Sequence, residues 1–391
     1  MIPADLSAEL ASAISVAIAA GDLPPGAARL EASGTWRPVP AGPAPAGTGT
    51  GTGTGTGASA RSYATSLPFD LARLAGQEPA AVAARLARAL APVTWISSAT
   101  PTGGGYLTIE VTGDALARLA VRISRAGPSC ARSDALAGRT QAAPPLPALA
   151  AEPGWEQAWR DQAAALTGRL AAAAGATVTP SPLPQRSGPA GPAAPADCMA
   201  PASPAPPPSV AAAVAYVGVD AVRYWLARTP TGRTGDLGRG IAVMYDLTDP
   251  WYLVSFAHED AASVLRWAGD LGVSRAEPDG RLADLLGAAA ELALLAQLSW
   301  LAERVAGAAR RGRPAELPRY LEELAAAWLD CRESCPALPF GGRAAPRDHA
   351  GIGARLWLAD ATRTVLAAGL SLVGVAPRER LPVDARAASV V

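Results

Sequence analysis

The chain has 391 residues and no net charge at neutral pH, because 34 basic residues balance 34 acidic ones. All the basic residues are arginine, since the sequence contains no lysine. A phosphate-binding P-loop and a Schiff-base enzyme each need a lysine, so both classes are excluded. Nucleic-acid-binding proteins often carry a basic excess, so any such function here must rest on local placement of arginine.

The composition also limits how much of the chain can fold. Glycine and proline number 39 and 37, and aromatic residues make up only 5%. This predicts long stretches without a core, and the length favours two or three domains. The four cysteines do not form a disulfide framework, the start of the chain is not basic, and no apolar run reaches the length of a membrane span. We therefore expect a cytoplasmic protein.

The first helix is predicted over residues 5–20, where Leu6, Leu10, Ile14 and Ile18 share one face. Gly21 is expected to end it. Residues 38–60 contain a Pro-Ala-Gly run and then five Gly-Thr repeats. We interpret them as a flexible insertion, because neither the strand nor the helix that flanks a phosphate-binding loop is present.

The next part completes a predicted small α/β domain over residues 1–124. Two helices are expected within residues 67–91, separated at Gly76 and Pro79. Two strands should follow at 93–97 and 106–111, and Asp114 should cap a helix that runs to about Ile123.

Residues 125–210 are rich in alanine, proline, glycine and serine. One helix is predicted near residues 155–174. The rest, above all 180–208, is predicted to be a disordered linker, because it cannot bury enough apolar surface to fold.

From residue 211 to the end, the pattern predicts an antiparallel helical bundle, so the protein as a whole should be mainly α. Asp249-Pro250 is a strong helix start, with aspartate as the cap and proline in the first turn. The expected helices cover residues 220–228, 250–268, 282–309, the stretch from Pro314 or Pro318 to just before Pro336, and 353–373.

Several motifs in this half occur in a familiar order, at Gly218–Leu226, Asp249–His258 and Ala354–Leu366, the last continuing over Gly369–Val375. Together with Pro318–Leu324 and Cys335-Pro336, they resemble the C-terminal anticodon-binding domain, of the DALR type, of arginyl-tRNA synthetases. The resemblance covers nearly all of residues 211–385. It implies a helical domain that binds the anticodon arm of a tRNA.

The N-terminal part is similar to the small domain with which the same family contacts the tRNA elbow. The similarity lies in Tyr63–Ser66, Leu71–Gly76 and Gly105–Ile109. Ser66 stands where that family usually has asparagine.

The family's catalytic domain should lie between these two parts, where this chain has the predicted linker. The nucleotide-binding signature of that domain needs paired histidines, and the only histidines here are His258 and His349. Its second loop needs a lysine. The resemblance therefore implies a non-catalytic, tRNA-binding relative with no catalytic residues, no cofactor and no metal. Two alternatives stay open: an arginine–tRNA ligase that charges tRNA in an ATP-dependent reaction, and a protein-interaction module derived from the same fold.

Anticodon bases are read by aromatic stacking, and arginine binds phosphate. The expected tRNA-binding residues are Tyr216, Arg223, Arg228, Arg233, His258, Tyr320, Trp328, Arg355 and Arg363. Each also has a structural interpretation: the aromatics as core, Arg223 and Arg363 as partners of Asp220 and Asp360, and His258 as a buried histidine. Besides tRNA, a synthetase or another protein is a possible partner. Cys331 and Cys335 lack the ligand spacing of common zinc sites.

Overall fold

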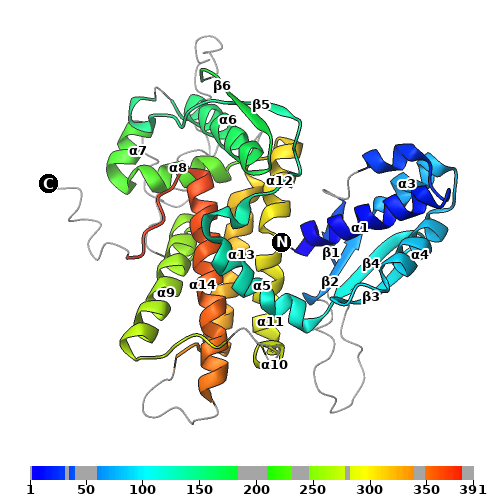
Figure 1. Cartoon of the computed structure of the whole chain (residues 1–391). Coiled ribbons are helices and arrows are strands. Elements are labelled where there is room, and N and C mark those ends of the chain that lie inside the picture. The colour runs from blue at the N-terminus through cyan, green and yellow to red at the C-terminus, as the bar shows by residue number, and fades with distance from the viewer. Residues whose placement is uncertain are drawn as a thin grey trace, which may run out of the picture. The chain divides into compact units, whose positions relative to one another are not determined.

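The computed structural model describes residues 2–30, 35–39, 60–152, 154–183, 209–230, 246–277, 282–338 and 348–380. These residues are mainly helical, with a small β-sheet in the N-terminal part, as the sequence predicts (Figure 1). They form two compact units that alternate along the chain. The first unit comprises residues 1–130, 261–303 and 327–365, and the second comprises residues 131–260, 304–326 and 366–391.

The first unit contains a four-stranded antiparallel sheet in the order β1-β2-β4-β3. Its strands are β1 (Trp36–Pro38), β2 (Ser62–Thr65), β3 (Ile96–Thr102) and β4 (Tyr106–Val111). In β4, Leu107, Ile109 and Val111 alternate with less buried residues, which is the pattern of a strand with one face on a core. The β3 strand begins at Ile96, later than predicted, and extends to Thr102.

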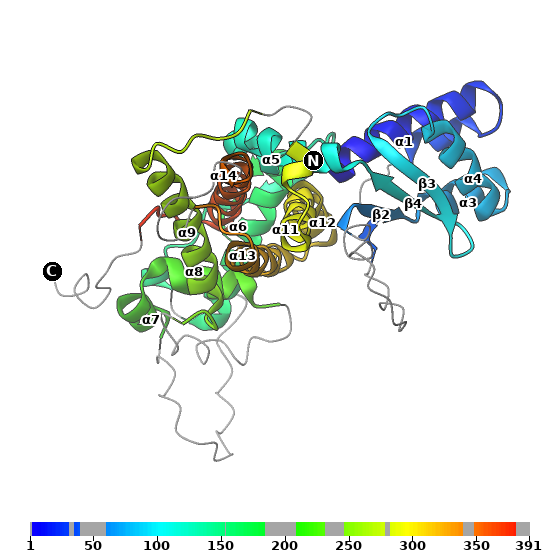
Figure 2. The ribbon, with the colours of Figure 1, turned by 90° about the horizontal axis from the view of Figure 1, so that it is seen from below.

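Helices cover this sheet. The helices are α1 (Ile2–Ala19), α3 (Leu67–Ala75) and α4 (Pro79–Leu90), and a short 3-10 turn, η1 (Pro25–Arg29), follows α1. α3 and α4 pack on the strands and α1 packs on α4 (Figure 2). Leu6, Leu10 and Ile14 are buried as predicted. The predicted break is confirmed, because α3 ends at Gly76 in the left-handed conformation (φ +63°) and Pro79 begins α4.

The helix after the sheet, α5 (Gly113–Ala126), is capped differently from the prediction. Thr112, not Asp114, is the cap, because its hydroxyl accepts a hydrogen bond from the N–H of Ala115 at 3.2 Å. Asp114 instead lies in the first turn and forms an ion pair with Arg118.

The single helix predicted over Leu282–Ala309 is in fact three helices. These are α10 (Leu282–Leu285), α11 (Ala289–Ser299) and α12 (Leu301–Arg311). At the break between α11 and α12, the hydroxyl of Tyr63 donates to the buried Ser299 hydroxyl at 3.0 Å, and the Tyr63 ring packs on Trp300 at 5.5 Å. The interruption therefore coincides with a tertiary contact to β2 that no local pattern contains.

The second unit contains folded structure where the sequence predicts a linker. The predicted helix is present as α6 (Trp155–Ala173). It lies between two strands that pair in parallel, β5 (Thr140–Ala143) and β6 (Thr177–Pro180), with 3-10 turns at η2 (Gly127–Ala131) and η3 (Leu149–Ala151). Residues 127–152 and 154–183 are therefore folded, which corrects the linker prediction there; residues 153 and 184–208 lie outside the described part of the chain.

Small residues allow α6 to approach β5 closely. A Cβ added at Gly168 would lie 2.7 Å from the Cα of Ala143 and 2.9 Å from the carbonyl oxygen of Ala142. An apolar cluster joins α6 to α7 (Val210–Val217) and α8 (Val219–Arg228). Its buried members are Leu149, Ala158, Val210, Ala213, Val222 and Leu226.

The remaining helices are α9 (Pro250–Asp270), α13 (Glu316–Ser334) and α14 (Asp348–Val373). The start of α9 is confirmed, because the Asp249 carboxylate accepts a hydrogen bond from the N–H of Tyr252 at 2.8 Å. This helix runs two residues past its predicted end. α14 stops at Gly374, whose φ of +92° favours glycine, as predicted.

Among the described residues, two helices are long and apolar enough to cross a membrane when only length and composition are considered. They are Ile2–Ala19 and the stretch Ala350–Val373 of α14. In the folded protein, 72% of the α14 stretch is buried, which identifies it as a core helix. α1 packs on α4, and 39% of its stretch is buried.

Gly168→Ala is expected to destabilise the protein by about 1–2 kcal/mol, because overpacking against the β5 backbone exceeds the helix-propensity gain of about 1 kcal/mol. Gly269→Ala is the control, since a Cβ there meets nothing within 4 Å. Urea unfolding followed by circular dichroism should show the control at or above wild-type stability. A Gly168→Ala protein as stable as the control would contradict the close approach.

Candidate nucleic-acid interface

Helix α8 carries two of the predicted tRNA contacts, Arg223 and Arg228. Both side chains bind other groups of the protein. The guanidinium of Arg228 donates to both carboxylate oxygens of Glu322, at 2.7 and 3.1 Å, and lies 5.7 Å from the centre of the Trp225 ring. The hydrogen bonds to Glu322 raise the pKa of Arg228. A bidentate pair of this kind orders the guanidinium, so Arg228 fastens α8 to α13.

Arg223 is half-buried and binds carbonyl groups instead of the predicted carboxylate. It donates to the carbonyl oxygen of Gly374 at 3.0 Å and to that of Pro147 at 3.3 Å. Burial lowers its pKa, and the nearby Asp220 opposes that shift. The side chain therefore connects α8 to the chain just beyond α14, within the second unit.

His258 is a buried histidine, which was the structural interpretation given for it above. It is only 2% exposed, and its Nδ1 lies 3.0 Å from the backbone oxygen of Arg378. The side chain of Arg378 in turn pairs with Asp220 at 3.3 Å. These contacts hold the segment after α14 against α9 and α8.

Arg355 neutralises a buried carboxylate in the first unit. Its Nε donates to Glu291 at 2.7 Å, and the side chain of Glu291 is only 1% exposed. Arg355 also donates to the carbonyl oxygen of Pro336, and the second oxygen of Glu291 accepts from the N–H of Ala288. The pair connects α14 to the start of α11.

Arg363 pairs with Asp360, as its structural alternative predicts, at 2.9 Å. Arg275 binds the other oxygen of the same carboxylate at 3.0 Å and lies over the Trp357 ring at 4.8 Å. The indole of Trp357 donates to the carbonyl oxygen of Ala276 at 2.8 Å. This network holds residues 275 and 276 against α14.

The predicted aromatic contacts divide into buried and exposed ones. Tyr320 and Trp328 are 1% and 2% exposed, so they belong to the core and we do not retain them as stacking residues. Tyr216 on α7 is 64% exposed and is retained. Arg233 lies outside the described residues.

The structure adds an aromatic residue that was not among the predicted aromatic contacts. Trp267 on α9 is 51% exposed and borders a groove of about 730 Å³ between the ends of α9 and α13. Leu271, Leu329 and Pro336 make most of the groove apolar, while Arg332 provides a cation at its wall. Trp267 does not lie on the buried face of α9. Its position relative to that face could have predicted from the sequence that its side chain is exposed.

Positive charge gathers in one segment of this neutral protein. Residues 304–319 contain five arginines and a single acidic residue, Glu316. Glu316 pairs with Arg311 and lies 4.0 Å from Arg313. This cluster was not among the predicted tRNA contacts.

Cys331 and Cys335 are both buried. Burial raises the pKa of the Cys331 thiol to about 12, so it is not a ready thiolate ligand. Among the described residues, no group of three or more histidine, cysteine or acidic side chains is arranged to hold a metal ion.

A family comparison matches residues 254–381 to the DALR anticodon binding domain. That stretch contains α10 to α14 and most of α9. It includes the Trp267 groove, the basic segment and the Arg355 and Arg363 networks.

The curated relatives that the chain matches are arginine–tRNA ligases. The chain is 38% identical over 167 residues to the arginine–tRNA ligase of Frankia alni, and 38% identical over 170 residues to that of Micrococcus luteus. The matches cover 42% and 43% of this chain but only 29% and 30% of those ligases. The chain thus spans less than a third of the length of the relatives it matches.

A solved arginyl-tRNA synthetase from Thermus thermophilus aligns with a TM-score of 0.57 and 14% identity, over 97% of this chain and 100% of that one. This likeness concerns the fold. With the sequence matches, the resemblance is confirmed: the chain carries a DALR anticodon-binding domain and is related to arginine–tRNA ligases.

Arg355→Met should cost about 2–3 kcal/mol of unfolding free energy, because it leaves Glu291 buried and unpaired. That range is below the value for a fully buried pair, since Arg355 is 27% exposed. Arg363→Met is the matched control and should cost about 1 kcal/mol or less, because Arg275 still neutralises Asp360. Chemical denaturation of both variants measures the difference. Equal losses would contradict a special role for Arg355.

Proposed function

We propose that this protein binds the anticodon arm of a tRNA and does not charge it with an amino acid. The observation that carries the proposal is the DALR match over residues 254–381, in a chain related to arginine–tRNA ligases. The proposed setting is the cytoplasm.

The surface of the matched segment supports the RNA-binding part. Unpaired bases bind by stacking on exposed aromatic rings beside cationic groups. Trp267 offers such a ring, with Arg332 at the wall of the same groove. In the second unit, the arginines of residues 304–319 can contact phosphates, and Tyr216 offers a second exposed ring.

The chemistry of the chain supports the non-catalytic part. Activating an amino acid with ATP requires cationic and hydrogen-bonding groups organised on the phosphates. The sequence has no lysine and only two histidines, and His258 is buried within the bundle. The protein would therefore handle or sense tRNA, alone or together with a synthetase.

One alternative is arginine–tRNA ligase activity, which is the name of the curated relatives. Another is a protein-interaction module, which the neutral charge and the apolar lining of the Trp267 groove favour. Binding and charging assays separate the three.

The purified chain should retain tRNA in a filter-binding assay at low salt, with an affinity that falls as salt rises, because phosphate contacts release counterions. Incubation with arginine, ATP and tRNA should yield no charged tRNA. Absence of binding at low salt would favour the protein-interaction module, whereas ATP-dependent charging would establish the ligase.

Trp267→Ala should weaken tRNA binding by about 5- to 140-fold, the range expected when one stacked base loses its aromatic partner. Trp267→Phe is the control and should keep most of the affinity, because a flat ring remains. Competition filter binding with both variants measures the effect. An alanine variant that binds like the wild type would remove this groove from the interface.

A further inference from the structure

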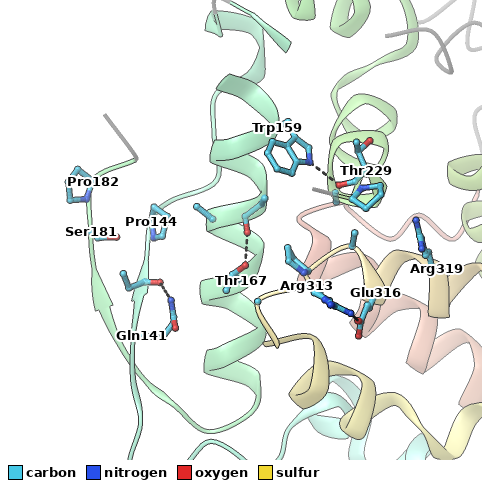
Figure 3. A pocket seen from close by; sticks show the side chains of 18 residues that line it. Gln141, Pro144, Trp159, Thr167, Ser181, Pro182, Thr229, Arg313, Glu316 and Arg319 are labelled. Atoms are coloured by element: carbon cyan, nitrogen blue, oxygen red, sulfur yellow. Dashed lines mark hydrogen bonds and ion pairs between the residues drawn. The ribbon is translucent and has the colours of Figure 1, made fainter. Parts of the chain in front are cut away.

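A second cavity lies in the second unit, apart from the residues assigned to the Trp267 groove. Its volume is about 810 Å³, which is the size of a small-molecule site. Figure 3 shows its walls: the strands β5 and β6 with α6 on one side, and the start of α13 on the other. The charged residues among its lining are Arg313, Glu316 and Arg319.

The cavity lies beside a β-α-β unit and reaches the ends of its strands. β5, α6 and β6 form a unit of two parallel strands connected by a helix. Gln141, Ala142 and Pro144 line the cavity where β5 ends, and Ser181 and Pro182 line it just after β6. The cavity therefore reaches the carboxyl ends of both strands, which is the end at which ligands bind in open parallel sheets.

The opposite wall is cationic. Arg319 is exposed and has no ion pair with any described residue, and Arg313 is 72% exposed. Glu316 pairs with Arg311 and also lies 4.0 Å from Arg313, so one carboxylate faces three arginines and the wall keeps a positive excess. The cavity also lies beside the start of the 19-residue helix α13, whose N-terminal end adds partial positive charge. An anion is therefore favoured at this wall.

The cavity also offers a flat apolar surface and neutral polar groups. The Trp159 ring is held in place because its Nε1 donates to the carbonyl oxygen of Thr229 at 2.8 Å (Figure 3). Thr167, Ser181 and Gln141 add hydroxyl and amide groups to the lining. A ligand that combines an anionic group with a planar ring fits this combination.

We propose that this cavity binds a phosphorylated ligand of mononucleotide size, with Arg319 and Arg313 on its phosphate and Trp159 beside its ring. Both a free nucleotide and the terminal nucleotide of an RNA strand have this chemistry. The proposal does not depend on tRNA binding at the Trp267 groove, so Trp267→Ala should leave this site intact.

The test is equilibrium dialysis of the full chain against three probes: AMP, inorganic phosphate and a 5′-phosphorylated RNA hexamer. AMP should bind at least tenfold more tightly than phosphate. Arg319→Gln should weaken AMP binding about tenfold, as expected for loss of a charge-assisted hydrogen bond. Ser181→Trp, which fills the cavity, should abolish it. Arg132→Gln is the control, because Arg132 is exposed in the same unit and does not line the cavity.

Circular dichroism melting shows that each variant is folded. Binding of AMP assigns the site to free nucleotides, and binding of the hexamer alone assigns it to an RNA end. The proposal is overturned if no probe binds at millimolar concentration. It is also overturned if Arg319→Gln and Ser181→Trp bind AMP as tightly as Arg132→Gln does.

Discussion

The arginines of α8 and α14 are bound to the protein itself, and this constraint decides which surfaces are left for a ligand. Arg228 is held by Glu322, and Arg355 by a carboxylate that is almost fully buried. Removing a charge partner from such a position is costly, because a carboxylate out of water needs a counter-charge. These arginines therefore maintain the bundle, and the proposed RNA contacts lie on residues that the bundle leaves exposed.

Two exposed features of the described residues differ in their chemistry. In the first unit, Trp267 borders an apolar groove between two helix ends. In the second unit, arginines gather at the start of α13, where Tyr224 donates to the carbonyl oxygen of Pro318 at 2.9 Å and so fixes the backbone next to Arg319. A neutral protein can bind RNA through such local features, because stacked rings and arginine–phosphate contacts both contribute to the affinity.

The sequence predicted the features that depend on local chemistry. The Asp249 cap, the break at Gly76 and the end of α14 at Gly374 each follow from one or two residues. β5 and β6 were missed because their residues are small and largely exposed, without the alternation that marks a strand. The division of the helix at Ser299 was missed because Tyr63, more than 200 positions away, makes the contact there.

The candidate site was harder to predict, for a related reason. An arginine on a helix has the same sequence signature whether it faces RNA or a carboxylate, and only the tertiary fold places Glu322 beside Arg228 or Glu291 beside Arg355. Burial likewise separates Trp328, in the core, from Trp267, on the surface. The family resemblance was enough to place the anticodon-binding domain in the sequence. The packed structure showed that Trp267 is exposed.

The most direct test of the account is chemical footprinting of a tRNA in the presence of the protein. Protection should concentrate on the anticodon loop, and cross-links from that loop should map to the peptide that contains Trp267. A tRNA whose anticodon loop stays fully reactive while other regions are protected would contradict the account.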